Sequence, residues 1–290
     1  MRLLDDLRAY VECKVKEMLS WSEALRREPF PEEPLTFVVE AVVTQSWHFP
    51  NSWDRLVEAL RERSYGKWRA STECQRTVER RPSHVEAKPL VGLDDLLCVR
   101  ETLLHLYEET GKEAWRRKAE AIEALKERLE SAGSLRAWVS ELHEAILGGF
   151  LRRGGRGPEC LEGVKGIGAK GACDIVRTLG HFDVAPIDVH ERRFLLRTGI
   201  VCRYGPASFD PRDKMSYLEA LRNFCREELS GEEVLGIDLG EAPGIADVAI
   251  WYFCSERGRN VCGNIPKCDE KRCPLRDRCL YYFLTHAWRG

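Results

Sequence analysis

Apolar residues recur in steps of three and four along most of this 290-residue chain, which is the spacing of one face of an α-helix. At the start of the chain, Leu4, Leu7, Val11, Val15 and Met18 follow this spacing. No segment of the sequence shows the apolar–polar alternation of a half-buried β-strand, and there is no internal repeat. The pattern therefore predicts an all-α protein.

The breaks between the predicted helices follow prolines, glycines and losses of periodicity. The proline-rich segment 28–34 ends the first helix, and residues 35–45 are apolar almost all round, which predicts a central buried helix. The basic segment 64–92 has little periodicity and is long for a loop, so we expect an insertion there. Further helices are predicted at about 52–63, 93–110, 113–131, 134–147, 189–198, 213–229 and 244–254.

The net charge of −2 hides an uneven distribution of charge along the chain. Residues 61–88, 150–203 and 255–290 each carry a net charge of +4, so the rest of the chain is acidic. Local basic patches of this kind suit a polyanionic partner. An ordinary fluctuation of charge along the sequence is the alternative.

The sequence also constrains the compartment. It contains no run of about 20 apolar residues, so we expect no membrane-spanning helix. Its start carries acids among the apolar residues, which is typical of an amphipathic helix and not of a signal peptide. We therefore expect the protein to lie in the cytoplasm, and we expect it to be a monomer. Disulfides are disfavoured in that compartment, so clustered cysteines there favour a metal centre.

A glycine-rich turn at 161–176, LEGVKGIGAKGACDIV, is the most informative local motif. Gly166 and Gly168 bracket Ile167, which predicts a tight reversal between two helices with the isoleucine packed inward. Unshielded amides in such a turn, together with the N-terminus of the next helix, can bind a phosphate. A plain turn between two helices is the alternative.

Lys170 stands at the start of the helix that follows this turn. If its side chain is partly buried there, its pKa is expected to fall towards that of a nucleophilic amine, which can form a Schiff base. Eighteen residues further on, Pro186 precedes Asp188, which occupies the N-cap position of a helix that carries His190 and Arg193. A purely structural helix cap is the alternative role for Asp188.

These residues together resemble the helix–hairpin–helix and aspartate signature of the endonuclease III and 8-oxoguanine glycosylase superfamily of DNA glycosylases. The turn 166–170 (GIGAK) and the segment 188–190 (DVH) match that signature in order. Lys165 stands where the family commonly has proline, a departure that affects the rigidity of the turn. The resemblance covers residues 140–290 well and residues 35–60 weakly.

The resemblance implies a role for each matching residue. Lys170 would attack C1′ of a damaged deoxynucleotide and then drive β-elimination of the 3′ phosphate. Asp188 would stabilise the developing positive charge on the sugar and help to deprotonate the amine. Gln45 would fill the gap left by the flipped base, although a solvated loop glutamine is the alternative. The further residues implied to contact DNA are Gly166, Ile167, Gly168, His190 and Arg193.

Four cysteines are closely spaced near the end of the chain, in the order Cys262-x5-Cys268-x4-Cys273-x5-Cys279. Four thiolates within eighteen residues can close around one metal centre. Endonuclease III-like relatives carry a [4Fe–4S] cluster on a similar pattern, C-x6-C-x2-C-x5-C, so the resemblance implies this cluster here. Zinc is the alternative, since four thiolates suit it equally. Cys254 is expected to be a core cysteine, and the basic residues around the motif suit contact with the phosphate backbone.

The resemblance implies a two-lobed fold, with residues 32–180 in one domain and residues 1–31 and 181–290 in the other. It also implies a bifunctional DNA N-glycosylase and AP (abasic-site) lyase of base excision repair, nucleoid-associated, that flips a damaged base out of double-stranded DNA. Oxidised pyrimidines are the first expected substrates, from the cysteine tail, and 8-oxoguanine is the alternative, from residues 170–174 (KGACD). The alternatives of another class are a non-catalytic Fe–S protein that binds damaged DNA and a zinc-stapled helical adaptor.

Overall fold

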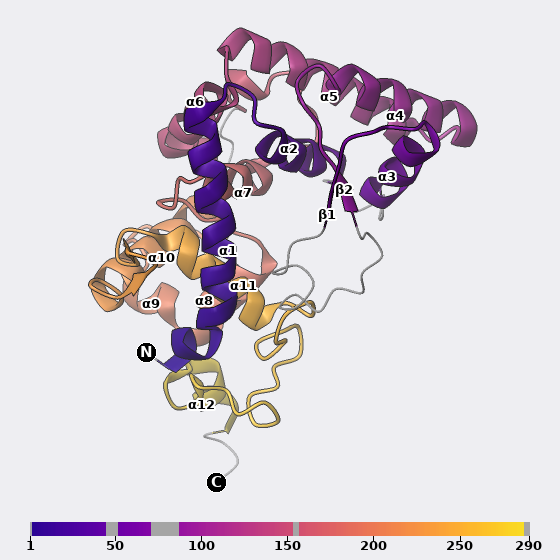
Figure 1. The fold of residues 1–290 in the computed structure, drawn as a ribbon. Coiled ribbons are helices and arrows are strands. Elements are labelled where there is room, and N and C mark those ends of the chain that lie inside the picture. Colours follow the sequence, from indigo (N-terminus) through magenta and orange to yellow (C-terminus); the bar gives the residue numbers. More distant parts are fainter. Residues whose placement is uncertain (1, 45–51, 71–86, 153–156, 287–290) are drawn as a thin grey trace.

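The computed structural model describes residues 2–44, 52–70, 87–152 and 157–286 (Figure 1). Twelve α-helices account for most of this part of the chain, which confirms the prediction of an all-α protein. Gln45 and residues 71–86 of the basic segment lie outside the described residues.

Helix α1 (Arg2–Arg27) runs along the length of the molecule and contacts α2, α6 and α11 (Figure 1). The elements above and beside its upper half are α2 (Glu32–Thr44), α3 (Ser52–Glu62), α4 (Leu96–Thr110), α5 (Glu113–Ala132), α6 (Leu135–Ala145) and α7 (Ala169–Thr178). The elements around its lower half are α8 (Val189–Thr198), α9 (Ile200–Tyr204), α10 (Lys214–Glu228), α11 (Pro243–Cys254) and α12 (Leu280–His286). Single turns of π-helix (Ile146–Phe150) and 3₁₀-helix (Glu159–Leu161 and Arg276–Arg278) complete the helical structure.

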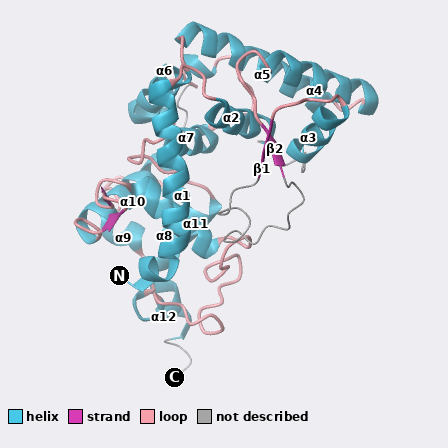
Figure 2. Cartoon of the chain, in the orientation of Figure 1, coloured by secondary structure: helices cyan, strands magenta, loops and turns pink. Residues whose placement is uncertain are grey.

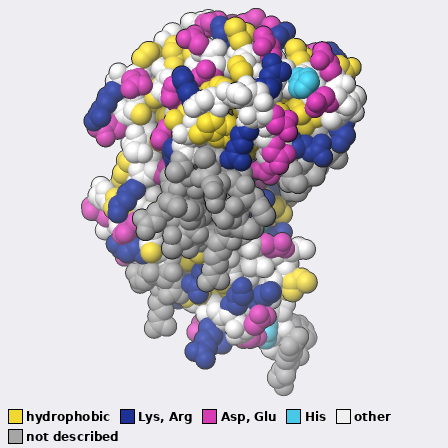
Figure 3. All heavy atoms as spheres, turned by 45° about the vertical axis from the view of Figure 1, so that its right-hand side comes forward, with side chains coloured by type: hydrophobic (Ala, Val, Ile, Leu, Met, Phe, Trp, Pro, Cys, Tyr) yellow, Lys and Arg dark blue, Asp and Glu magenta, His cyan; other side chains and the backbone are white. Residues whose placement is uncertain are grey.

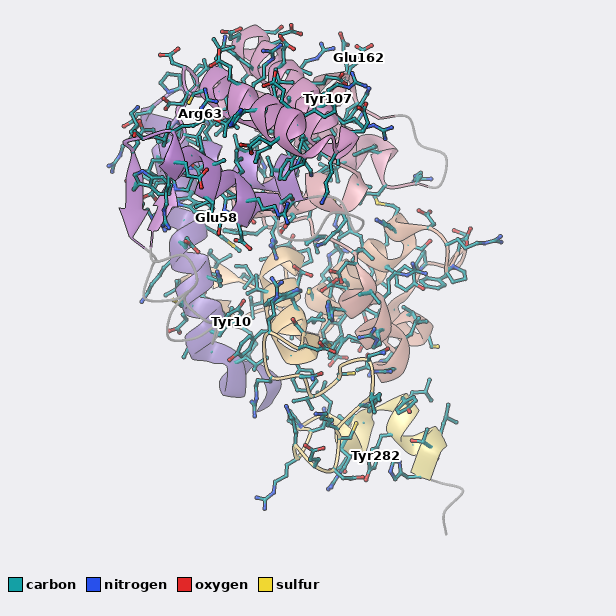
Figure 4. All side chains as sticks on the ribbon, turned by 90° about the vertical axis from the view of Figure 1, so that its right-hand side faces the viewer. Tyr10, Glu58, Arg63, Tyr107, Glu162 and Tyr282 are labelled. Carbon is teal, nitrogen blue, oxygen red and sulfur yellow. The ribbon has the colours of Figure 1, made fainter. Side chains whose placement is uncertain are left out.

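One connected apolar core joins helices α1 to α11. Val38, Val39 and Val42 of α2 are fully buried, as expected for a helix that is apolar almost all round. Tyr10 of α1 faces the lower helices and stacks on Tyr252 of α11, with the ring centroids 3.9 Å apart (Figure 4). Because α1 packs against elements of both halves, it ties them together. The division into two domains at residues 31 and 180 stays a prediction.

Two short antiparallel ladders interrupt the helices, where the sequence analysis expected no strand (Figure 2). Strand β1 (Trp68–Ala70) pairs with β2 (Ala87–Pro89), and β3 (Glu233–Val234) pairs with β4 (Ile237–Asp238). Strands of two or three residues are too short to show an alternating pattern in the sequence, which is why they were missed. The first ladder closes the base of the basic segment.

The connection between α7 and α8 positions the start of α8. Val184, Ala185 and Ile187 in this connection are fully buried. The carbonyl oxygen of Phe182 accepts a hydrogen bond of 2.8 Å from the amide of Gly244, at the start of α11. The connection is therefore fixed against the core before it reaches Asp188, so that the side chain of Asp188 has a defined place.

Candidate active site

The glycine turn packs against the C-terminal end of α2. Gly166 has φ = +110°, and a Cβ atom at this position would lie 3.3 Å from the carbonyl oxygen of Val42. Ile167 is buried, as the sequence predicts. Gly168, in extended backbone, precedes α7 and offers no side chain to cap the helix. The first amides of any helix have no intrahelical partner, and here no side chain of the capping residue binds them. This end of α7 therefore suits an anion.

Lys170 and Asp188 meet at the N-terminal ends of two helices. Nζ of Lys170, in the first turn of α7, lies 3.5 Å from Oδ2 of Asp188, the residue before α8. The lysine side chain is 43% exposed and the aspartate side chain is 18% exposed, so a substrate can reach the pair from solvent. The structure thus brings together the two residues that the sequence singled out.

The two oxygens of the Asp188 carboxylate have different partners. Oδ1 accepts a hydrogen bond of 2.6 Å from the amide of His190, and Glu191 completes a capping box by accepting from the amide of Asp188. Oδ2 is the atom that faces Lys170. Asp188 is therefore a helix cap and a partner of Lys170 at once, so the two interpretations of this residue do not exclude each other.

The pKa of Lys170 moves against the expectation from the sequence. Burial lowers it, but the carboxylates of Asp174, Asp188 and Glu191 outweigh burial, and the pKa is raised. The expectation of a lowered pKa was wrong because the sequence did not show how many acids surround this lysine. Burial likewise opposes ionisation of Asp188, but Glu191, the His190 amide and Lys170 hold its pKa below the usual value. The resting pair is an ammonium beside a carboxylate.

Behind Asp188 lies a buried group of acids that the sequence analysis missed. Glu191 of α8 and Asp247 of α11 are each 1% exposed, and Arg177 of α7 forms ion pairs with Asp247 and Asp174. Burial, Asp247 and Asp188 raise the pKa of Glu191 well above its usual value. Burial also raises the pKa of Asp247, to about 7, against the effect of Arg177. A proton on Glu191 supplies a donor that the ionised group lacks.

This buried group predicts a pH dependence of stability. Because the native pKa values of Glu191 and Asp247 are raised, their contribution is full below about pH 4 and is lost as the pH rises through the native values. Asp188 has a lowered pKa, so its contribution is present above the unfolded pKa and is lost as the pH falls through its native value. We expect urea unfolding to show a free energy that falls from about pH 5 to pH 8.

Glu191→Gln is expected to flatten this fall, since glutamine keeps a neutral hydrogen-bonding side chain at every pH. The measurement is the slope of unfolding free energy against pH in the variant and in the unaltered protein. An unchanged slope in Glu191→Gln would show that Glu191 titrates alike in the folded and unfolded chain.

Basic residues surround the Lys170–Asp188 pair. His190 and Arg193 lie one turn apart on α8 and are half-buried. The sequence analysis missed Lys214, the half-buried first residue of α10. Its pKa is lowered by burial, and Cys173 and Lys170 are the next groups that act on it. The ammonium of Lys214 has no hydrogen bond or ion pair with another residue in the described ranges, so it is available to an anion.

The predicted role of Gln45 falls outside the described residues, but the structure shows how its neighbours are held. The carbonyl oxygen of Val43 accepts hydrogen bonds from the hydroxyl of Ser52, at 2.7 Å, and from the ammonium of Lys118. These bonds hold the end of α2 beside the start of α3. Burial lowers the pKa of Lys118 to about 8.

The basic segment is less cationic in the structure than its composition suggests. Lys67 forms ion pairs with Glu32 and Asp95, and Arg69 pairs with Glu17 and Glu33 on α1 and α2. Figure 3 shows Lys and Arg side chains on both the upper and the lower part of the face in view, interspersed with acids. The part of the segment that the structure describes is therefore largely neutralised by neighbouring helices.

The cysteine loop between α11 and α12 is tied to the helix that Asp188 caps. The guanidinium of Arg197 on α8 donates to the carbonyl oxygens of Gly263, at 2.7 Å, and Asn264, at 3.0 Å. It also lies 3.7 Å from Sγ of Cys262, while the thiol of Cys279 donates to the carbonyl oxygen of Arg197. Any group that fixes the loop therefore also braces α8.

The four cysteines of the tail are free thiols gathered in one region. A hydrogen bond from the thiol of Cys254, together with Arg197, lowers the pKa of Cys262 to about 6. Burial and the charges of the other three cysteines of the motif raise the pKa of Cys268. Cys254 is fully buried, as predicted for a core cysteine, but its thiol contacts Cys262. In contrast to the expectation of reduced cysteines, Cys13 of α1 is disulfide-bonded.

The four cysteines of the tail are not arranged as the ligands of one tetrahedral zinc ion. Zinc–sulfur bonds of about 2.3 Å place tetrahedral ligands roughly 3.8 Å apart. Among the described residues, no three sulfur atoms of the motif lie within 4.8 Å of one another.

No family model and no curated protein sequence matches this chain. Among solved structures, it is similar to the 8-oxoguanine DNA glycosylase of Thermotoga maritima, with a TM-score of 0.47 and 20% sequence identity over 87% of this chain and 92% of that one. Any inference about the activity of this chain therefore rests on its own residues and not on this similarity. None of the described helices is both long and apolar enough to cross a membrane.

Proposed function

We propose that this protein is a DNA N-glycosylase with an associated AP lyase activity, which removes an oxidised base from double-stranded DNA. The observation that carries the proposal is the contact of 3.5 Å between the Lys170 ammonium and the Asp188 carboxylate, beside a turn of the helix–hairpin–helix pattern. An amine that attacks a sugar carbon needs an adjacent group that first takes its proton and then stabilises the positive sugar.

In the proposed reaction, Asp188 accepts a proton from the Lys170 ammonium. As the bond between C1′ and the base breaks, the bonding electrons leave with the base, which takes up the proton from Asp188, and the restored carboxylate stabilises the cationic sugar. The free amine then bonds to C1′, and ring opening gives a Schiff base. Loss of a proton from C2′ expels the 3′ phosphate, and water finally releases the amine.

The surrounding groups suit a DNA backbone. The turn at Gly166 and Gly168 and the N-terminus of α7 would hold one phosphate through backbone amides. Arg193 and Lys214 are half-buried cations near the same pair, and they would hold others. His190 has a buried Nδ1 without a hydrogen-bond partner among the described residues, so a nucleotide atom could supply one.

For the substrate, we propose an oxidised pyrimidine, on the strength of the cysteine tail. The second candidate is 8-oxoguanine, the base in the name of the Thermotoga maritima enzyme, and it is favoured by residues 170–174 (KGACD). A non-catalytic protein that binds damaged DNA has no need of the amine–carboxylate contact, which is why an enzyme is preferred.

We also propose that Cys262, Cys268, Cys273 and Cys279 hold a [4Fe–4S] cluster, with zinc as the alternative. When bound, the cluster would crosslink the loop and so brace α8 through Arg197. A brown protein with about four iron atoms per chain by metal analysis is expected. One zinc and no iron would contradict the cluster and leave the glycosylase proposal untouched.

The test of the function is trapping by borohydride, which reduces a Schiff base to a stable bond. The unaltered protein is mixed with duplexes that contain thymine glycol, 8-oxoguanine, uracil or an abasic site, and covalent adducts are separated by gel electrophoresis. An adduct with one damaged base supports the proposal and names the substrate. Strand cleavage only after hot alkali would indicate a glycosylase without lyase activity, and no cleavage even then would favour the binding protein.

Asp188→Asn separates the two roles of this residue. Asparagine caps a helix about as well as aspartate, so the variant is expected to fold, with a modest loss of stability from the ion pair with Lys170. Its carboxylate is lost, so the rate of base excision should fall by about 10²- to 10⁴-fold. Single-turnover kinetics would measure the loss, and a variant that is stable and fully active would rule out a catalytic Asp188.

A further inference from the structure

Two histidines and an aspartate meet at the end of α7 opposite to Lys170. Nε2 of His143, on α6, lies 2.9 and 3.0 Å from the two carboxylate oxygens of Asp183. The rings of His143 and His181 lie 4.2 Å apart between centroids. One ligand atom from each of the three residues falls within 4.8 Å of the other two. Because α7 has ten residues, the cluster is separated from Lys170 by roughly 15 Å of helix.

The backbone that carries His181 and Asp183 is held in place from several sides. The amide of His181 donates to the carbonyl oxygen of Val176 at 3.1 Å. Gly180 has φ = +108°, and a Cβ atom there would lie 2.5 Å from the hydroxyl oxygen of Ser22 on α1, so only glycine fits. The two ligand positions, two residues apart, are thus preset by the fold and need little ordering to bind an ion.

Neighbouring groups further along the loop complete this bracing. The carbonyl oxygen of Phe182 is bound by the amide of Gly244 at 2.8 Å. Nε of Arg222 on α10 donates to the carbonyl oxygen of Asp183 at 2.9 Å. The guanidinium therefore binds the main chain of Asp183 at this contact and leaves the carboxylate to His143 and to any ion.

The donor set has the chemistry of a zinc site. Imidazole nitrogen and carboxylate oxygen are both zinc ligands, with bonds of about 2.0–2.2 Å, and two such ligands on one tetrahedral ion lie roughly 3.3 Å apart. The observed contact of 2.9 Å between His143 and Asp183 is close to that separation. The ring nitrogens of His181 have no hydrogen bond to another residue in the described part of the chain, so the ring is available as a ligand.

The site is also open enough to exchange an ion. The side chain of Asp183 is 46% exposed and that of His143 is 16% exposed, which leaves room for water as a fourth ligand. Arg136 and Arg222 lie near enough to act electrostatically on this cluster, on His181 and Asp183 respectively. The positive charges of the two arginines disfavour binding of a divalent cation, and the negative charge of Asp183 offsets part of this repulsion.

We propose that His143, His181 and Asp183 form a second metal site, distinct from the cysteine loop, that binds one divalent transition-metal ion, with Zn²⁺ as the best fit. A bound ion would join α6 to the connection that leads from α7 to Asp188. Because it would bind the folded chain and not the unfolded one, it would stabilise the fold.

Cobalt(II) distinguishes the two sites, since its spectrum differs between thiolate and nitrogen–oxygen ligands. The protein as purified, with its cysteine loop in its native state, is dialysed against CoCl₂. We expect one Co²⁺ per chain with visible d–d bands, no new thiolate charge-transfer band, and displacement by Zn²⁺. His181→Ala and Asp183→Asn should each lose this Co²⁺, whereas His105→Ala, at an exposed histidine paired with Glu109 on α4, should retain it.

Circular dichroism of each variant shows that it is folded, and Asp183→Asn keeps the size of the side chain in case His181→Ala is unstable. Equal Co²⁺ binding by the unaltered protein and by folded His181→Ala and Asp183→Asn would overturn the proposal. So would an unaltered protein that binds no Co²⁺ or Zn²⁺ at a large molar excess, since the three residues would then be only a histidine–aspartate ion pair with a stacked ring.

Discussion

Lys170→Ala is expected to abolish covalent trapping and to lower base excision by about 10³-fold or more, because it removes the nucleophile of the proposed reaction. The effect has a structural basis in the ion pair at 3.5 Å from Asp188, which alanine cannot form. Alanine is a good helix former in the first turn of α7, so the variant should fold. Borohydride trapping and single-turnover kinetics on the preferred duplex are the measurements.

Lys165→Ala is the matched control for this experiment. Lys165 lies in the same turn, its side chain is 70% exposed, and its nearest ionic partner is Glu120 at 3.9 Å. Both variants lose one positive charge near the proposed DNA site, but only Lys170 pairs with Asp188, the proposed catalytic carboxylate. Lys165→Ala should therefore weaken DNA binding slightly and keep its covalent adduct.

Trapping that survives in Lys170→Ala would place the reactive amine elsewhere. Lys214 would then be the first residue to test, since it is half-buried, unpaired among the described residues and electrostatically linked to Lys170. Loss of the adduct in Lys170→Ala with intact base excision would instead indicate that a water molecule attacks the sugar.

Much of the fold could be predicted because each helix carries its own signals. The N-cap at Asp188 and the apolar face of residues 35–45 are local features, and they gave α8 and α2 with ends close to those observed. The two-residue strands β3 and β4 carry no such signal, since they depend on a turn at Leu235 and Gly236, both with positive φ. Elements of that length are set by tertiary context.

The candidate site was predictable in its two reacting residues and not in its surroundings. Lys170 and Asp188 lie on a sequence motif, whereas Glu191 and Asp247 meet only because α11 packs against α8. The predicted direction of the Lys170 pKa shift was wrong for the same reason, since acids from three separate elements raise this pKa. A single aspartate inside the apolar helix 244–254 was the available signal for Asp247.

Because it pairs with the buried Asp247, Arg177 is the residue whose substitution is expected to lower stability most. The side chain of Arg177 is 12% exposed, and its guanidinium forms ion pairs with Asp174 and with the fully buried Asp247. Gly244 leaves the space for its stem, because a Cβ atom there would lie 2.8 Å from Cγ of Arg177. Arg177→Met keeps most of the apolar stem and removes the charge, so Asp247 is left buried beside Glu191 without a cation.

We expect Arg177→Met to lower the free energy of unfolding by about 3–5 kcal/mol, the usual cost of breaking a buried ion pair from one side. Adding Asp247→Asn should recover part of the loss, because asparagine needs neither a cationic partner nor a proton at this buried position. Arg116→Met is the control: Arg116 pairs with Glu113 and Glu120 on the exposed face of α5, where ion pairs contribute little. Urea unfolding at neutral pH measures all three variants. Equal losses in Arg177→Met and Arg116→Met would mean that the pair of Arg177 and Asp247 is solvated, and that Asp188 is not backed by a dry acidic network.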